Sequence, residues 1–75
     1  MDKVVSDIIK KCKSIGDVDR IVKIGDKYVI TLSKNGKPLL DCFYSYKDGK
    51  LELYSPYKEF DKVMKAAEDP IYIRR

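Results

Sequence analysis

The stretch Leu39–Tyr46, with the sequence LLDCFYSY, is the longest run of strand-favouring residues in the chain. The dipeptides Asn35-Gly36 and Asp48-Gly49 frame it on both sides, and dipeptides of this kind are typical of tight β-hairpin turns. Strand-like segments lie beyond both turns, so the run is predicted to be the inner strand of an antiparallel meander.

The chain has 75 residues, which suits a single small domain over residues 1–75. It is 44% hydrophobic and 37% charged, with both signs present, as in a soluble globular domain. No run approaches the roughly 18 apolar residues of a membrane span, and the first residues lack the apolar core of a secretion signal. We therefore expect a cytoplasmic protein.

The chain contains two cysteines, Cys12 and Cys42, and no histidine. In a reducing compartment both thiols are expected to be small buried hydrophobes, because a disulfide between them would need an oxidising environment. A structural zinc site of the Cys/His kind is excluded by these numbers. No cofactor or metal is expected.

Residues 2 to about 14 are predicted to form an amphipathic helix, which Asp2 caps and Gly16 ends in a left-handed conformation. Its apolar stripe follows helical spacing: Val4, Val5, Ile8, Ile9, Cys12 and Ile15.

A second helix is predicted to begin at Ser55-Pro56, with serine as the cap and proline at the first helical position. Its apolar stripe consists of Tyr57, Phe60, Val63, Met64 and Ala67. Pro70 ends the helix, and Ile71-Tyr72-Ile73 forms either a short edge strand or a cover over the core.

The loop lengths between the strands decide which side chains share a face, because a shift of one residue reverses a strand. A two-residue turn at Gly25-Asp26 suits the type II′ geometry, but a three-residue loop gives the better apolar match and is favoured. A three-residue loop at Lys34-Asn35-Gly36 is favoured on the same ground. At Asp48-Gly49 the match favours a two-residue turn, which pairs Lys47 with Lys50.

These registers predict one apolar core face, made of Tyr28, Ile30, Leu32, Leu40, Cys42, Tyr44, Tyr46, Leu51 and Leu53. The fold class is α+β. An N-terminal helix, a four-stranded antiparallel meander and a C-terminal helix follow in the order α-β-β-β-β-α, with both helices on the core face.

No sequence pattern indicates catalysis. Histidine, the commonest general base near neutral pH, is absent, and neither a Gly-x-Ser-x-Gly elbow nor a Gly-rich phosphate loop occurs. Carboxylates at Asp17, Asp19, Asp41 and Glu52 could exchange protons, but they are more simply connection or surface residues. A non-enzymatic protein is expected.

The outer face of the predicted sheet is the candidate interaction face: Val29, Thr31, Leu39, Phe43 and Tyr54. Phe43 and Tyr54 are expected to form a cross-strand aromatic pair. They would anchor a partner protein, stack bases of a single-stranded nucleic acid, or only stiffen the sheet beneath the C-terminal segment.

The net charge of +4 suits either an acidic protein partner or nucleic acid. The candidate basic contacts are Lys23, Arg74 and Arg75. We expect an interaction module that binds another protein through the outer sheet face or an edge strand, as accessory proteins of bacteria and phages do. A weak, salt-dependent nucleic-acid-binding accessory protein is the alternative.

Overall fold

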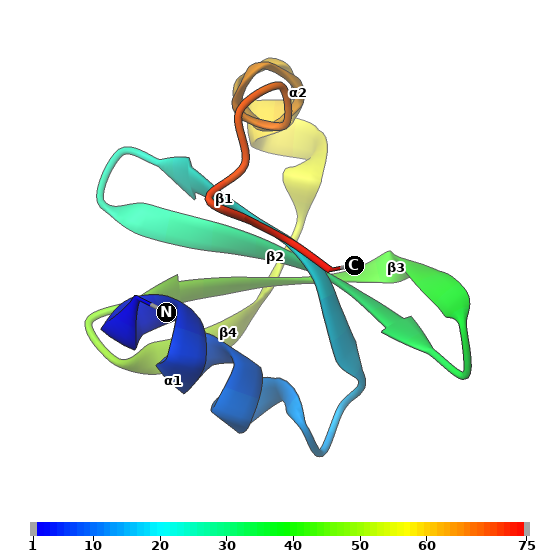
Figure 1. The fold of residues 1–75 in the computed structure, drawn as a ribbon. Coiled ribbons are helices and arrows are strands. Elements are labelled where there is room, and N and C mark those ends of the chain that lie inside the picture. The colour runs from blue at the N-terminus through cyan, green and yellow to red at the C-terminus, as the bar shows by residue number, and fades with distance from the viewer. Residues whose placement is uncertain (1, 75) are drawn as a thin grey trace.

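The computed structural model describes residues 2–74, and within this range the side chains of all residues except Leu40, Asp41, Cys42 and Pro56. The elements in chain order are α1 (Lys3–Cys12), β1 (Asp17–Ile24), β2 (Lys27–Lys34), β3 (Lys37–Lys47), β4 (Lys50–Tyr54), the 3₁₀ helix η1 (Pro56–Glu59), α2 (Phe60–Ala66) and β5 (Tyr72–Ile73). The five strands form one antiparallel sheet in the order β4-β3-β2-β1-β5 (Figure 1). The predicted α+β class and meander are confirmed, with β3 as an inner strand.

The C-terminal segment adds a fifth strand to the four that were expected. The Ile71 amide donates to the Ile21 carbonyl over 2.9 Å, and the Arg74 amide donates to the Asp19 carbonyl over 2.8 Å. β5 therefore covers the edge of β1, so the short edge strand was the correct one of the two alternatives for residues 71–73.

α1 forms as its apolar spacing predicts. Its first turn is capped by Asp2, whose Oδ1 accepts a hydrogen bond of 2.8 Å from the Val4 amide. Val5, Ile8 and Cys12 are buried against the sheet. The phenol of Tyr46 donates a hydrogen bond to Asp7, which fixes the helix to β3.

Gly16 does not end α1 in a left-handed conformation, so that prediction is wrong. The residue is required for a different reason, which is lack of space. A Cβ atom at this position would lie 2.7 Å from the Ser33 carbonyl oxygen on β2. The sheet backbone therefore passes where a side chain would begin.

Two turns share the type I′ pattern, with both central residues at positive φ. Asp48 and Gly49 have φ angles of 51° and 78°, and the pairing of Lys47 with Lys50 confirms the predicted two-residue turn. Asn35 and Gly36 have φ angles of 54° and 79°. They pair Lys34 with Lys37, so the three-residue loop expected there is wrong.

A bulge in β3 shifts the register that the Asn35-Gly36 turn sets between β2 and β3. Ser33 pairs with Pro38, whereas Thr31 pairs with Phe43, so β3 carries extra residues between the two pairs. A bulge of this kind changes the alternation of side chains along a strand. As a result Tyr28 lies opposite Tyr46 and Ile30 opposite Tyr44, which is the predicted sharing of the core face.

The first hairpin also closes with a two-residue turn, because Ile24 pairs with Lys27. The favoured three-residue loop is therefore wrong, and the core face receives Ile21 instead of Val22. Both valines of the opposite row are nevertheless buried, Val22 with 4% exposure and Val29 with 1%. Counting the apolar residues that share a face could not decide between the two registers, because both faces of this hairpin are apolar.

The two helices lie on opposite faces of the sheet, contrary to the prediction that both cover one face (Figure 1). α1 packs on the core face, in a cluster with Ile21, Ile30 and Leu32. The segment from η1 to β5 connects the two edges of the sheet and crosses the outer face, where Val63 of α2 lies over Val22 and Val29. We call residues 55–71 the crossover segment.

The buried core lies between α1 and strands β1 to β3. Of the predicted core face, Ile30, Leu32 and Tyr46 are buried, but Leu53 on the edge strand is 73% exposed. The side chains of Leu40 and Cys42 lie outside the described residues. In the described part of the chain, neither helix has the length and apolar character that crossing a membrane requires.

Candidate functional site

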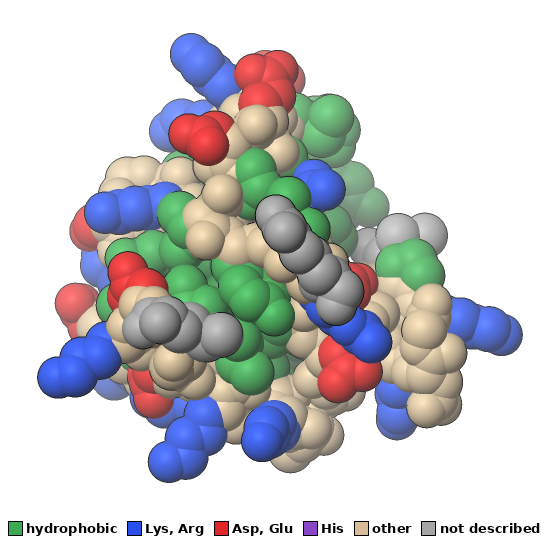
Figure 2. Space-filling model, viewed as in Figure 1, with side chains coloured by type: hydrophobic (Ala, Val, Ile, Leu, Met, Phe, Trp, Pro, Cys, Tyr) green, Lys and Arg blue, Asp and Glu red, His purple; other side chains and the backbone are tan. Residues whose placement is uncertain are grey.

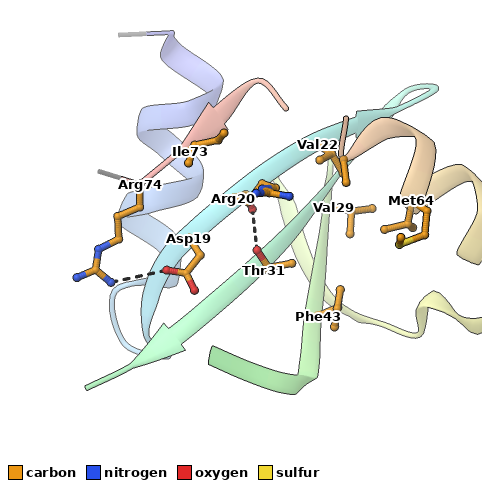
Figure 3. Close-up of a pocket in the computed structure, with 11 residues that line it drawn as sticks. Asp19, Arg20, Val22, Val29, Thr31, Phe43, Met64, Ile73 and Arg74 are labelled. Atoms are coloured by element: carbon orange, nitrogen blue, oxygen red, sulfur yellow. Dashed lines mark hydrogen bonds and ion pairs between the residues drawn. The ribbon is translucent and has the colours of Figure 1, made fainter. Parts of the chain in front are cut away.

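A groove with a volume of about 440 Å³ lies between α2 and the outer face of the sheet. Its floor is formed by β1, β2 and β3 through Val22, Val29, Thr31 and Phe43. Its far wall is formed by α2 through Val63, Met64 and Ala67. We call this hollow the outer-face groove (Figure 3).

The third side of the outer-face groove is polar in part. Asp19 and Arg20 from β1 lie there with Ile73 and Arg74 at the C-terminal end. Figure 3 shows Arg20 and Val22 on one strand, with Val29 and Met64 on the side toward α2. The groove is therefore apolar over its floor and far wall, and carries charge along one side.

Large apolar side chains remain exposed on α2 and β5. None of the residues Phe60–Ala66, all of which the structure describes, is fully buried. Phe60 and Met64 are each 55% exposed, and Ile73 is 49% exposed. Figure 2 shows apolar side chains at the surface beside α2. The predicted apolar stripe of this helix is thus only partly used inside the fold.

One end of the crossover segment is held by a polar cluster of Lys27, Tyr54 and Glu59. The Tyr54 phenol donates a hydrogen bond of 3.1 Å to Glu59 Oε1, and Lys27 forms an ion pair with the same carboxylate. The Lys27 Nζ atom also lies 4.9 Å from the centre of the Tyr54 ring. Tyr54 therefore anchors η1 to the sheet.

This cluster shifts the acidity of its members. Burial, and then the hydrogen bond to Glu59, raise the pKa of Tyr54 to about 12. The hydrogen bond from Lys27 lowers the pKa of Glu59. Both shifts favour the charge states in which the three side chains hold together.

The Tyr54 phenol is expected to ionise about two pH units later than an ordinary tyrosine, which titrates near pH 10. Because the pKa is raised in the folded state, its contribution to stability is complete below pH 10 and is lost as the pH rises toward 12. Ultraviolet titration of the six tyrosines should show a phenol that ionises near pH 12. Tyr54→Phe should remove this ionisation.

Two variants control this titration. Tyr57→Phe, at a position 87% exposed, should leave the late phenol in place. Glu59→Gln should lower the pKa of Tyr54 only in part, because burial is the larger cause. An unchanged titration in Tyr54→Phe would contradict the assignment.

The other end of the crossover segment is held by Arg74. Its Nη1 donates to the Ser33 hydroxyl over 3.1 Å and lies 3.5 Å from Asp17 and 3.7 Å from Asp19. The Ser33 hydroxyl in turn donates to Asp19 over 3.0 Å. These two carboxylates therefore stabilise the attachment of β5.

The predicted interaction face is only partly assembled. Phe43 pairs with Tyr54 as expected, and Phe43 lies in the groove floor with Thr31 and Val29. Val29 is almost completely buried, so it offers no exposed surface. Leu39 lies apart from them and packs against the core cluster.

The predicted basic contacts do not form one surface with these aromatic residues. Lys23 pairs with Tyr28, on the face opposite Phe43, and its Nζ lies 5.8 Å from the Tyr28 ring centre. Arg74 is engaged with Asp17 and Asp19, and Arg75 lies outside the described residues. On the face shown in Figure 2, the Lys and Arg side chains are scattered.

No protein-family model matches this chain, and no curated protein or solved structure is significantly similar to it. What can be said about its activity therefore comes from its own residues.

The structure bears on the predicted absence of a metal site only through the side chains that it describes. Among the described side chains, no three potential metal ligands lie close together. Glu52 is an exposed strand residue, and the side chain of Asp41 lies outside the described residues. Cys12 is a free, buried thiol whose pKa is raised by burial, and a low thiol pKa is what reactivity requires.

Sequence reasoning missed Arg20, Val22, Val63, Met64, Ala67 and Ile73 as parts of the groove. One signal was available, because Ile21-Val22 and Val29-Ile30 place apolar residues on both faces of the first hairpin. A hairpin with two apolar faces needs a cover on each side. The C-terminal helix was the remaining element that could supply the second cover.

Proposed function

We propose that this protein is a small non-enzymatic interaction module, which binds another protein through the outer-face groove and its exposed apolar rim. The observation that carries the proposal is the groove of about 440 Å³ with Met64 and Ile73 exposed at its border. Exposed apolar side chains that adjoin a hollow are typical of protein-binding surfaces, and a side chain that fills such a hollow supplies much of the binding energy.

The nucleic-acid alternative has less support. It requires aromatic side chains and cations on one surface, whereas Lys23 lies on the face opposite Phe43. The Tyr54 ring is also occupied by its contacts with Lys27 and Glu59. The edge strand β4 is the second route to a protein partner, because Leu53 is 73% exposed there.

Met64→Asp is expected to weaken partner binding at least about tenfold, since it places a charge at the border of an apolar site. The partner should first be isolated with the tagged wild-type protein, then purified and titrated by calorimetry. Met64 is 55% exposed, so the variant should fold. Circular dichroism would check this.

Leu53→Asp is the matched control, because it introduces the same charge at another exposed apolar position. It should leave the affinity unchanged. A loss confined to Leu53→Asp would assign binding to the β4 edge instead of the groove. A nucleic-acid partner whose affinity falls steeply with salt would overturn the proposal.

A further inference from the structure

Arg20 is the charged side chain of the outer-face groove whose charge the described residues leave unbalanced. It lies on β1 between Ile73 on one neighbouring strand and Thr31 on the other. Its side chain lines the groove and is half-buried. Among the side chains that the structure describes, the guanidinium forms no ion pair, whereas Arg74 has two carboxylates beside it.

The other charges of the groove cannot compensate Arg20. Asp19 is the acidic residue of the lining, and it already accepts a hydrogen bond from Ser33 and lies beside Arg74. A guanidinium keeps its charge at every accessible pH and presents a planar fork that matches a carboxylate. Arg20 is thus a preformed donor at the edge of an apolar hollow.

Any occupant of the groove would displace water from Arg20. Removing water from an unpaired charge is costly, whereas a carboxylate brought by the occupant offsets that cost with charge-assisted hydrogen bonds. We infer that the groove takes an acidic, apolar peptide segment of the partner protein, with a bulky apolar side chain against Phe43 and Met64 and an Asp or Glu side chain on Arg20. This inference rests on the proposed function and names the chemistry of its partner.

A peptide suits the site better than a small amphipathic acid. A volume of about 440 Å³ would hold either, but Met64 and Ile73 in the lining are about half exposed and form an apolar rim at the surface. A peptide covers the hollow and this rim together. The net charge of +4 also favours the approach of an acidic segment.

The test is a selection of random peptides displayed on phage, carried out on the immobilised wild-type protein and on Arg20→Glu. The wild-type protein should enrich peptides that combine aromatic or aliphatic residues with Asp or Glu. Arg20→Glu should enrich Lys or Arg in place of the acidic residue. Circular dichroism of both proteins would verify that the fold is intact.

An enriched peptide is then synthesised with its acidic residue and with the corresponding amide. Arg20→Gln should weaken binding of the acidic peptide about tenfold, as the loss of one charge-assisted pair predicts, and should not weaken binding of the amide form. Lys23→Gln is the matched control: it removes one positive charge from the opposite face and should leave the affinity unchanged.

Four outcomes would overturn the inference, and they separate loss of the role of Arg20 from failure of the proposed function. Enriched peptides without acidic residues, or equal losses in Arg20→Gln and Lys23→Gln, would remove the role of Arg20 and leave the groove in place. Binding of decanoate as tight as that of the peptide would assign a small amphipathic acid. Peptides that bind Met64→Asp as well as wild type would refute the groove itself.

Discussion

Replacement of Ile30 by alanine is expected to lower the free energy of unfolding by about 2–5 kcal/mol, the range for truncating a buried isoleucine. Ile30 lies on the inner strand β2 with 0% exposure, in the cluster that joins α1 to the sheet. A domain of this size is stabilised by only about 4–11 kcal/mol. The variant should therefore lose a large share of its stability and unfold at a lower urea concentration, which urea denaturation followed by circular dichroism would measure.

Leu53→Ala is the control for this prediction, because Leu53 stands in the same cross-strand row. Ile30 pairs with Tyr44, and Tyr44 pairs with Leu53, so all three side chains point to one face. Leu53 is 73% exposed, and its truncation should cost less than about 0.5 kcal/mol. If Ile30→Ala is too unstable to measure, Ile30→Val should cost about 0.5–1.5 kcal/mol. Equal effects at the two positions would contradict the placement of the core.

Gly16→Ala is expected to destabilise the protein by about 1–3 kcal/mol, as overpacking against a rigid neighbour does. The new Cβ would lie 2.7 Å from the carbonyl oxygen of Ser33. That atom belongs to the backbone of β2 and cannot move aside as a flexible side chain would. The midpoint of urea denaturation, compared with wild type, measures the effect.

Gly25 separates this steric cause from a conformational one. It has open space around its Cβ position but a φ angle of 60°, which asparagine tolerates better than alanine. Gly25→Asn should thus be milder than Gly25→Ala, whereas Gly16→Asn should be at least as damaging as Gly16→Ala. A tolerated Gly16→Asn would show that the conformation of Gly16, and not its lack of space, is what matters.

Features that depend on neighbouring residues could be predicted from the sequence. The stripe of α1, its cap at Asp2 and the turn at Asp48-Gly49 are set by contacts within a few residues, and all three are confirmed. The turn at Asn35-Gly36 shows the limit of this reasoning. This turn adopts the type I′ conformation that its two residues prefer. The bulge in β3 then shifts the register so that the apolar side chains of β2 and β3 still share one face.

The placement of the second helix could not be predicted in the same way. An apolar stripe shows that a helix packs on something, but it does not name the face of the sheet. Because β4 and β5 lie at opposite edges, the chain between them must cross the sheet. α1 already covers the core face, so the crossing falls on the other one.

The sequence therefore predicted only those residues of the groove floor that lie on β2 and β3. Strand alternation placed Phe43 opposite Tyr54 and Val29 near Thr31, because period-two patterns are local. The crossover segment brings Met64 to the same groove as Arg20 of β1, which is a long-range feature. No pattern within either segment could have joined them.

The crossover segment is attached mainly at its two ends, by the polar cluster at Glu59 and by Arg74, with few buried contacts between. A segment of this kind is expected to open as a unit while the remaining sheet stays folded, since local opening follows the density of buried contacts. When the segment opens, α2 should move away from the sheet and expose Val22 and Val29 without global unfolding. Its amide protons should exchange with solvent well before those of β2.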